Sequence, residues 1–104
     1  MEVLKNVDLV KKANVYFDGN VTSRSFTSSD GSKMSLGIMM PGVYNFGTNE
    51  AELMEILEGT VEVKLAGSDT WNTYTSNTSF NVEANSSFDI KVKTITDYCC
   101  SYIK

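Results

Sequence analysis

Near its middle the chain reads Glu55-Ile56-Leu57-Glu58-Gly59-Thr60-Val61-Glu62-Val63-Lys64-Leu65, a pattern that recurs through most of the sequence. In a strand, Val61, Val63 and Leu65 would share one face, and the charged residues between them would share the other. Such alternation is typical of antiparallel sheets with one buried side. Glycine adopts positive φ without a Cβ clash, so we expect a hairpin turn at Glu58-Gly59.

The same alternation returns toward the C-terminus, at Phe88, Ile90 and Val92 and again at Tyr98, Cys100 and Tyr102. Turn signals rich in Gly, Asn and Asp separate such runs, for example Asp30-Gly31. No segment after residue 15 keeps a helical period over about ten residues, although Asn49 to Leu57 could begin with one helical turn capped by Thr48. The pattern predicts an all-β barrel or sandwich.

With 104 residues, the chain has the size of one domain. We expect a β domain over residues 15–104, preceded by an N-terminal extension over residues 1–14 that forms a short helix or an edge strand. The net charge of −4 argues against nucleic-acid binding, because phosphate backbones attract clustered Lys and Arg. No apolar run approaches the roughly 20 residues of a membrane span, and the first residues do not resemble a signal peptide. We therefore expect a cytoplasmic protein without membrane or nucleic-acid partners.

The chain contains no histidine. This removes the commonest general base, the commonest metal ligand and every nucleophile that needs an imidazole partner. The two cysteines, Cys99 and Cys100, are neighbours, so a disulfide between them would be strained and they are too few for a structural zinc site. On a strand they would point to opposite faces, and we expect one buried and one outward thiol.

A series of short motifs runs in order from residue 16 to the C-terminus. It includes Tyr16-Phe17-Asp18-Gly19, Asp30-Gly31-Ser32-Lys33, Leu36-Gly37-Ile38-Met39-Met40-Pro41-Gly42, Phe46-Gly47-Thr48, Met54-Glu55-Ile56-Leu57 and Phe80-Asn81-Val82. In this order and spacing the chain resembles the pyrimidine/purine nucleoside phosphorylase family of small cupins. The resemblance implies a single-domain, cupin-like antiparallel β-barrel of the jelly-roll type that pairs as a homodimer. It also implies that purine and pyrimidine nucleosides react with inorganic phosphate, without a cofactor, to give free base and ribose 1-phosphate.

Positioning and electrostatic stabilisation can supply most of the barrier reduction for such a reaction, so histidine is not required. For phosphate the first candidate is Lys33, because its turn places a cation beside backbone N–H groups and the hydroxyls of Ser32 and Ser35. The alternative is that Lys33 is a solvated surface lysine. Arg24, the one arginine of the chain, is the second candidate.

The ribose needs a carboxylate that accepts its hydroxyls and stabilises positive charge, as in glycoside chemistry. Glu55 is the first candidate for this catalytic role, because its strand neighbours are apolar and it could point inward, and Glu50 is the second. Alternation leaves open that Glu55 lies on the polar face instead. We expect no metal, since a hard cation needs oxygen ligands that converge in space and not merely in sequence.

Aromatic side chains could stack on any base, which suits a broad range of nucleosides. With Asn81 for the edge of the base and Thr48 from the family motif, the binding candidates are Tyr44, Phe46, Trp71, Phe80, Tyr98 and Tyr102. Aromatic residues also fill the core of small barrels, and we prefer that role for Phe80 and Phe88. The tyrosines are more promising, because a buried phenol needs a hydrogen-bond partner that a ligand can be.

Two other functions stay open. One is a non-catalytic cupin that binds a sugar or a nucleoside, and the other is an isomerase or epimerase of sugar phosphates, because one fold hosts many functions. The lack of histidine counts against the second, since most such enzymes need a metal or an imidazole base. Cationic and carboxylate groups that converge in the mouth of the barrel would favour the enzyme, and an apolar interior would favour the binder.

Overall fold

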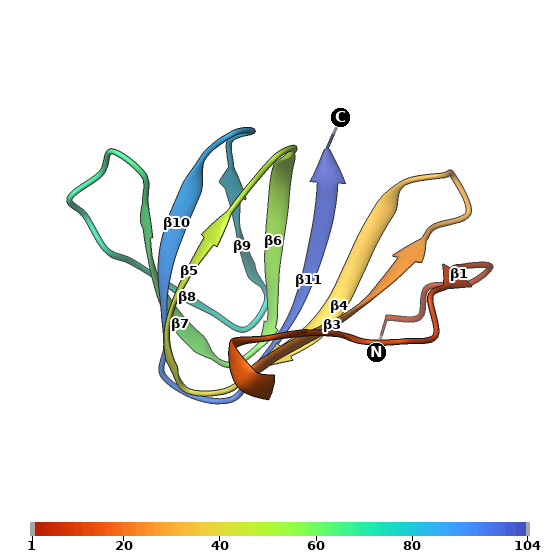
Figure 1. Ribbon diagram of the computed structural model, residues 1–104, viewed down its shortest axis with the longest axis horizontal. Coiled ribbons are helices and arrows are strands. Elements are labelled where there is room, and N and C mark those ends of the chain that lie inside the picture. The colour runs from red at the N-terminus through yellow and green to blue at the C-terminus, as the bar shows by residue number, and fades with distance from the viewer. Residues whose placement is uncertain (1, 104) are drawn as a thin grey trace.

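The computed structural model describes residues 2–103, which form two antiparallel β-sheets (Figure 1). The strands in chain order are β1 (Asp8–Leu9), β2 (Asn14–Tyr16), β3 (Val21–Thr27), β4 (Lys33–Met39), β5 (Gly42–Gly47), β6 (Ala51–Glu58), β7 (Thr60–Leu65), β8 (Asn72–Thr75), β9 (Thr78–Val82), β10 (Ser87–Val92) and β11 (Thr96–Ile103). One short 3-10 helix, η1 (Phe17–Gly19), lies between β2 and β3. The all-β prediction is confirmed. The helical turn considered at Asn49 to Leu57 is wrong, because most of that segment extends as β6.

The larger sheet has the strand order β1-β3-β4-β11-β6-β9, with β2 also paired to β3, and the smaller has the order β5-β10-β7-β8. In Figure 1 the smaller sheet lies at the left, and the larger sheet occupies the centre and the right. No hydrogen-bonded pair of the described strands joins one sheet to the other. The two sheets therefore form a sandwich, and they do not close into the barrel that we expected.

Several connections cross between the sheets instead of forming hairpins. Glu58 ends β6 in the larger sheet and Thr60 begins β7 in the smaller one, so the hairpin predicted at Glu58-Gly59 is wrong. Gly59 has a φ of 121°, and a sheet crossing needs this conformation as much as a hairpin does. Asp30-Gly31, by contrast, connects β3 to its pairing partner β4 and forms a hairpin.

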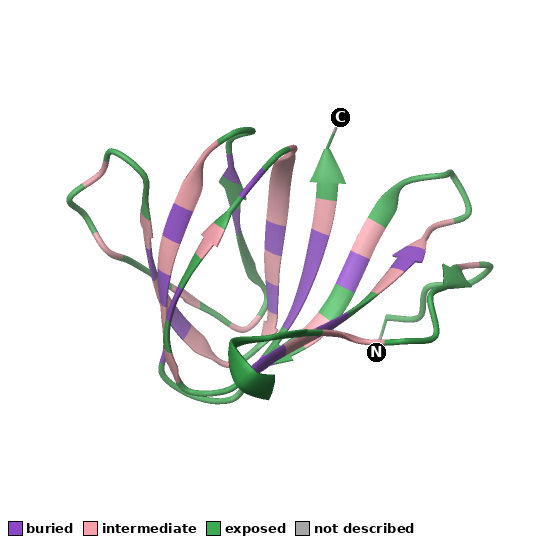
Figure 2. Ribbon diagram, in the orientation of Figure 1, coloured by how far each residue is buried: buried purple, intermediate pink, exposed green. Residues whose placement is uncertain are grey.

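The core lies between the two sheets, and Figure 2 shows its buried residues as bands on the strands. Val61 and Val63 are at most 2% exposed, as the alternation predicts, whereas Leu65 at the end of β7 is 37% exposed. The inward faces predicted for the C-terminal strands are confirmed for Phe88, Ile90 and Val92. Phe80 is also buried in the core, as we preferred.

Both cysteines are buried, so the prediction of one outward thiol is wrong. Cys100 belongs to the core, and Cys99 points to the opposite side of β11 yet is only 5% exposed. Burial, and then the nearby charges of Glu55, Glu2 and Asp97, raise the pKa of Cys99 to about 11. Because β11 lies between β4 and β6, neighbouring residues shield a thiol that alternation alone places at the surface.

The N-terminal segment lies along the edge of the larger sheet. Its strand β1 pairs with β3, with Asp8 opposite Thr27, and the Arg24 Nε atom donates a hydrogen bond to the Lys11 carbonyl oxygen at 3.4 Å. For this segment the structure shows an edge strand and not a helix. Within residues 2–103, no helix is both long enough and apolar enough to cross a membrane.

Candidate active site

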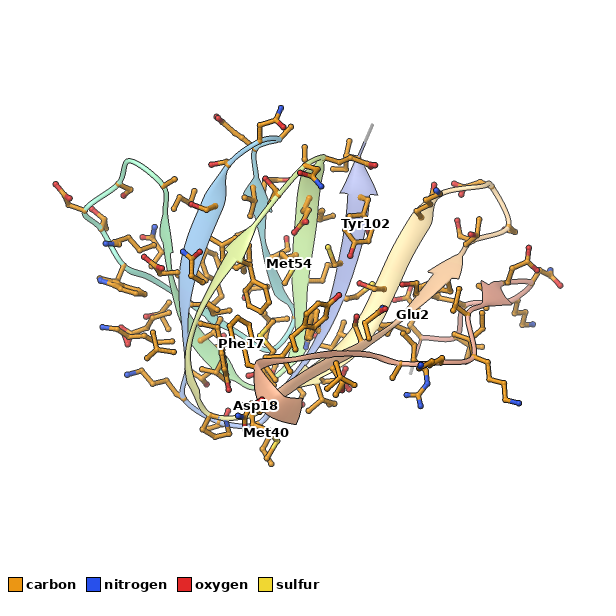
Figure 3. The ribbon with its side chains drawn as sticks, in the orientation of Figure 1. Glu2, Phe17, Asp18, Met40, Met54 and Tyr102 are labelled. Carbon is orange, nitrogen blue, oxygen red and sulfur yellow. The ribbon has the colours of Figure 1, made fainter. Side chains whose placement is uncertain are left out.

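A cavity of about 170 Å³ opens between the two sheets. Its polar lining comes from Tyr16, Ser23, Ser35, Glu52, Tyr98 and Tyr102. Phe46 and Phe88 of the smaller sheet contribute aromatic faces to it. The polar groups converge because alternate residues of a strand point to one face. Figure 3 shows Met54 and Tyr102 on the neighbouring strands β6 and β11, which supply much of this lining.

Three polar groups meet where β4, β11 and β6 lie side by side. The Ser35 Oγ and Tyr102 Oη atoms are 3.3 Å apart, within hydrogen-bond distance. Tyr102 lies opposite Glu52 in the pairing of β11 with β6, and Cys100 shares the inward face of β11 with Tyr102. A hydroxyl pair and a carboxylate therefore lie next to each other at the cavity.

Burial changes the ionisation of these groups. It raises the pKa of Glu52 above its ordinary value, and the hydrogen bond from Cys100 opposes the shift without cancelling it. Burial also raises the pKa of Tyr102 to about 12, so its phenol is neutral at physiological pH. Glu52 is the one carboxylate among the described residues that line the cavity, and no lysine or arginine is among them. Residues 2–103 hold no cluster of three or more His, Cys, Asp or Glu side chains suited to a metal ion.

A wider pocket of about 410 Å³ borders the cavity at Glu52, and we call it the rim pocket. Its lining includes Leu65, Asn81, Glu83 and Ser86. Asn81, predicted for the edge of a base, alternates with buried neighbours on β9, and so it points to the rim and not into the cavity.

Thr48 connects the loops that border the rim pocket. Its Oγ1 atom donates a hydrogen bond to the Glu83 carbonyl oxygen at 2.6 Å and accepts one from the Ser86 N–H at 3.0 Å. The side chain is buried, at 7% exposure. Thr48 was predicted to bind substrate, but its hydroxyl instead joins the β5–β6 loop to the β9–β10 loop.

Four of the predicted binding residues line the cavity: Ser35, Phe46, Tyr98 and Tyr102. Tyr44 is buried in the core beside them, and its hydroxyl donates a hydrogen bond to the Met40 carbonyl oxygen at 2.7 Å. The Tyr98 hydroxyl donates to the Thr22 carbonyl oxygen at 3.3 Å. Both buried phenols therefore have partners within the protein.

The two glutamates predicted to be catalytic do not line the cavity. Glu55 projects from the outer face of β6, because its neighbours Met54 and Ile56 are buried on the inner face. Glu50 precedes β6, and its Oε2 atom is buried without a hydrogen-bond partner among the described residues. The carboxylate that the structure brings to the cavity is instead Glu52.

Trp71 also lies outside the cavity. The Lys91 Nζ atom is 4.1 Å from the centroid of its ring and the Lys64 Nζ atom is 5.6 Å from it. Both lysines alternate with inward residues of the smaller sheet, so the ring lies on the outer face of that sheet.

Lys33 is exposed at the start of β4. In the turn before it, the Asp30 carboxylate accepts hydrogen bonds from the Ser28 hydroxyl and, at 2.9 Å, from the Ser32 N–H. These bonds, that from Ser28 above all, lower the pKa of Asp30 to about 2. The Ser32 N–H, which we expected to help bind phosphate, thus already donates its hydrogen bond to the Asp30 carboxylate.

Aromatic rings cover one end of the interior. The ring centroid of Phe17 is 5.0 Å from that of Tyr44 and 5.4 Å from that of Phe46. Phe17 and Asp18 have φ values of 51° and 56°, a conformation that costs energy for residues with a Cβ. Figure 3 shows Asp18 beside Met40 at the lower end of the molecule and Phe17 above them.

Three of the polar lining residues were not predicted: Tyr16, Ser23 and Glu52. The spacing could have indicated Glu52, because it shares the alternation of Met54 and Ile56, the apolar pair on its strand. Tyr16 lies on a strand of three residues, which is too short to show a period.

The chain is similar to known proteins over almost its whole length. The family model described as pyrimidine/purine nucleoside phosphorylase matches residues 11–102. A curated relative of that name from Syntrophotalea carbinolica is 56% identical over 104 residues, which are the whole of both chains. Another of the same name, from Sulfurimonas denitrificans, is 55% identical over 104 residues and also covers both chains completely.

Solved structures agree with the fold. A protein of unknown function from Acinetobacter sp. ADP1 superposes with a TM-score of 0.92 and 36% identity, over 95% of this chain and 96% of that one. One from Vibrio parahaemolyticus gives a TM-score of 0.86 and 44% identity, over 92% and 99% of the two chains. An RmlC-like cupin from Shewanella frigidimarina gives 0.69 and 10% identity, over 97% and 86%, and shows the cupin fold alone.

Proposed function

Because the chain belongs to the pyrimidine/purine nucleoside phosphorylase family, we propose that it is a phosphorylase of both purine and pyrimidine nucleosides. In this reaction inorganic phosphate replaces the base, and the products are the free base and ribose 1-phosphate. Inorganic phosphate is the co-substrate, and the proposal includes no cofactor. The observation that supports this proposal is a sequence identity of 55–56% with curated relatives of that name, over the full length of both chains.

The cavity has features that suit a neutral nucleoside. Its hydroxyls can bond the sugar, and the rings of Phe46 and Tyr98 offer faces on which any base can stack. Stacking is insensitive to the identity of the base, which supports a broad specificity. For phosphate we retain Lys33, which shares a face of β4 with Ser35 and lies at its exposed end.

One observation favours the second candidate, a cupin that binds a nucleoside without cleaving it. No lysine or arginine is among the described residues that line the cavity, whereas phosphorolysis requires a bound phosphate anion. The carboxylate of Glu52 and the family membership favour the enzyme.

The test is release of free base from uridine, cytidine, adenosine, guanosine and inosine, with and without phosphate. Phosphate-dependent release from both classes, with equimolar ribose 1-phosphate, would support the phosphorylase. Nucleoside binding without release in either condition would support the binder. Release that does not depend on phosphate would contradict both, because it indicates hydrolysis.

We also propose a homodimer that acts in the cytoplasm. A small sandwich gains stability by covering a face or an edge, and Leu36 and Ile38 leave more than a third of their surface exposed on the outer face of β4. Free thiols at Cys99 and Cys100 are consistent with a reducing compartment. Sedimentation velocity at micromolar concentration should show a dimer, and a profile with monomer alone would overturn this assembly.

A further inference from the structure

Glu52 is half-buried at the cavity without a charged partner in the described part of the chain. The ion pairs of residues 2–103 are Lys64 with Asp89 and Lys93 with Glu62, on the smaller sheet. An ionised carboxylate is costly in such surroundings unless a positive charge compensates it.

The groups around Glu52 do not supply that charge. On β11 its titratable neighbours are Cys100 and Tyr102, and on β9 the residue opposite it is Val82. Tyr16 and Tyr98, which belong to the same sheet, also line the cavity, and Glu83 lies at the rim. None of these side chains is a lysine or an arginine.

A positive charge does arise in the reaction of the proposed function. When the bond from C1′ to the base nitrogen breaks, its electron pair leaves with the base, and the ribosyl group becomes cationic. An oxygen of hydrogenphosphate then forms the new bond to C1′, and the proton of hydrogenphosphate is transferred, directly or through water, to the base. The charge on the sugar exists in the transition state and not in the bound nucleoside.

We propose that Glu52 is a catalytic residue. Its ionised carboxylate contacts the ribosyl group and stabilises the positive charge that develops there. This inference rests on the proposed function. Glu52 neither gains nor loses a proton in the step. Because its attraction strengthens in the transition state, it raises the rate of bond cleavage more than the affinity for substrate.

The neighbouring strand places hydroxyl groups beside the carboxylate. Tyr102 lies opposite Glu52 across the strands, and its phenol oxygen is 3.3 Å from the hydroxyl oxygen of Ser35. The hydroxyl pair offers donors and acceptors to the sugar beside the charge. A carboxylate fixed on a strand needs little reorganisation when the charge develops.

The test compares Glu52→Gln with Glu58→Gln, which removes the same charge at the exposed end of the same strand. In the phosphate-dependent assay, Glu52→Gln should lower kcat about 100-fold with KM within about threefold of wild type. Glu58→Gln should keep kcat within about twofold. The wild-type rate should fall as Glu52 becomes protonated at low pH, and this limb of the pH profile should be absent in Glu52→Gln.

A second measurement uses iminoribitol, a ribose analogue whose protonated ring nitrogen carries a positive charge. Glu52→Gln should weaken its binding about tenfold or more, while binding of the neutral nucleoside changes less than about threefold. Circular dichroism and thermal unfolding establish that both variants are folded.

The outcomes separate the two proposals. An active wild type together with an active Glu52→Gln, within about threefold in kcat, would overturn the role of Glu52 alone. Equal loss of affinity for iminoribitol and for the nucleoside would also overturn it, because the carboxylate would then bind the ground state equally well. A wild type without phosphate-dependent release would overturn the phosphorylase and the role together.

Discussion

The hydroxyl oxygens of Ser35 and Tyr102 lie 3.3 Å apart although 67 residues separate them in the chain. They meet because β11 pairs with β4 on one side and with β6 on the other. The same pairing places Glu52 beside the phenol. The polar side of the cavity is thus built across three neighbouring strands, and its parts can be tested separately.

The first prediction concerns Tyr102→Phe, which removes one hydroxyl and keeps the ring. We expect KM for nucleosides to rise about three- to tenfold while kcat stays within about threefold, because a sugar hydrogen bond contributes equally to ground and transition states. Tyr74→Phe is the matched control, since Tyr74 packs against Phe80 outside the cavity lining. An unchanged KM in Tyr102→Phe would show that this hydroxyl does not bind the substrate.

The second prediction concerns stability and pH. Burial raises the pKa of Glu52 above 4.5, so the contribution of this group to stability is greatest where it is protonated and is lost as pH rises through its folded pKa. Glu52→Gln should therefore be more stable than wild type at about pH 7, and the difference should vanish at about pH 4. Urea unfolding at both pH values measures this difference in the free energy of unfolding.

A residue kept for catalysis at the expense of stability would show this behaviour. Glu58→Gln serves as the control for loss of a charge. A Glu52→Gln variant that is less stable than wild type at neutral pH would contradict the prediction, because it would mean that the carboxylate holds the fold together.

The third prediction concerns Thr48→Val, which keeps the shape of a buried side chain and removes its hydroxyl. The Glu83 carbonyl and the Ser86 N–H would lose their partner, so the free energy of unfolding should fall by about 1–3 kcal/mol. Thr73→Val, exposed on β8, should change it by less than about 0.5 kcal/mol. Chemical denaturation of both variants measures the two changes in the free energy of unfolding. Equal changes would show that the hydroxyl of Thr48 contributes little to stability.

The fourth prediction compares two glycines with positive φ. A Cβ on Gly59 would lie 2.5 Å from the Thr96 Oγ1 atom and 2.9 Å from the Ile95 carbonyl oxygen, whereas a Cβ on Gly67 would have no neighbour within 4 Å. Gly67→Ala should cost about 1 kcal/mol from backbone strain alone. Gly59→Ala should cost at least about 2 kcal/mol more, because two packed segments must move apart. Similar unfolding midpoints for the two variants would show that the sheet crossing tolerates a side chain.

The sequence predicted the inward faces of the central strands well, but not the side of β6 that carries the carboxylate lining the cavity. The apolar partners Met54 and Ile56 indicate the inner face, and Glu52 follows from them by the period of two. Glu55 was selected because its neighbours in sequence are apolar. Those neighbours point inward, and so Glu55 points to the outer face. Lys33 was placed correctly at a hairpin, but the hydrogen bonds of Asp30 in that turn are invisible in the sequence.

The amino-acid sequence by itself determined an all-β chain, the buried face of its regular strands and the family, because these depend on local periodicity and on residue order. The tertiary structure alone decided which strands pair, which turns cross between the sheets and which side chains meet at the cavity. Gly59 illustrates the limit, since positive φ suits a hairpin and a crossing equally. Ser35, Glu52 and Tyr102 become neighbours only through the pairing of β11 with β4 and β6, a long-range choice set by the packing of the whole core.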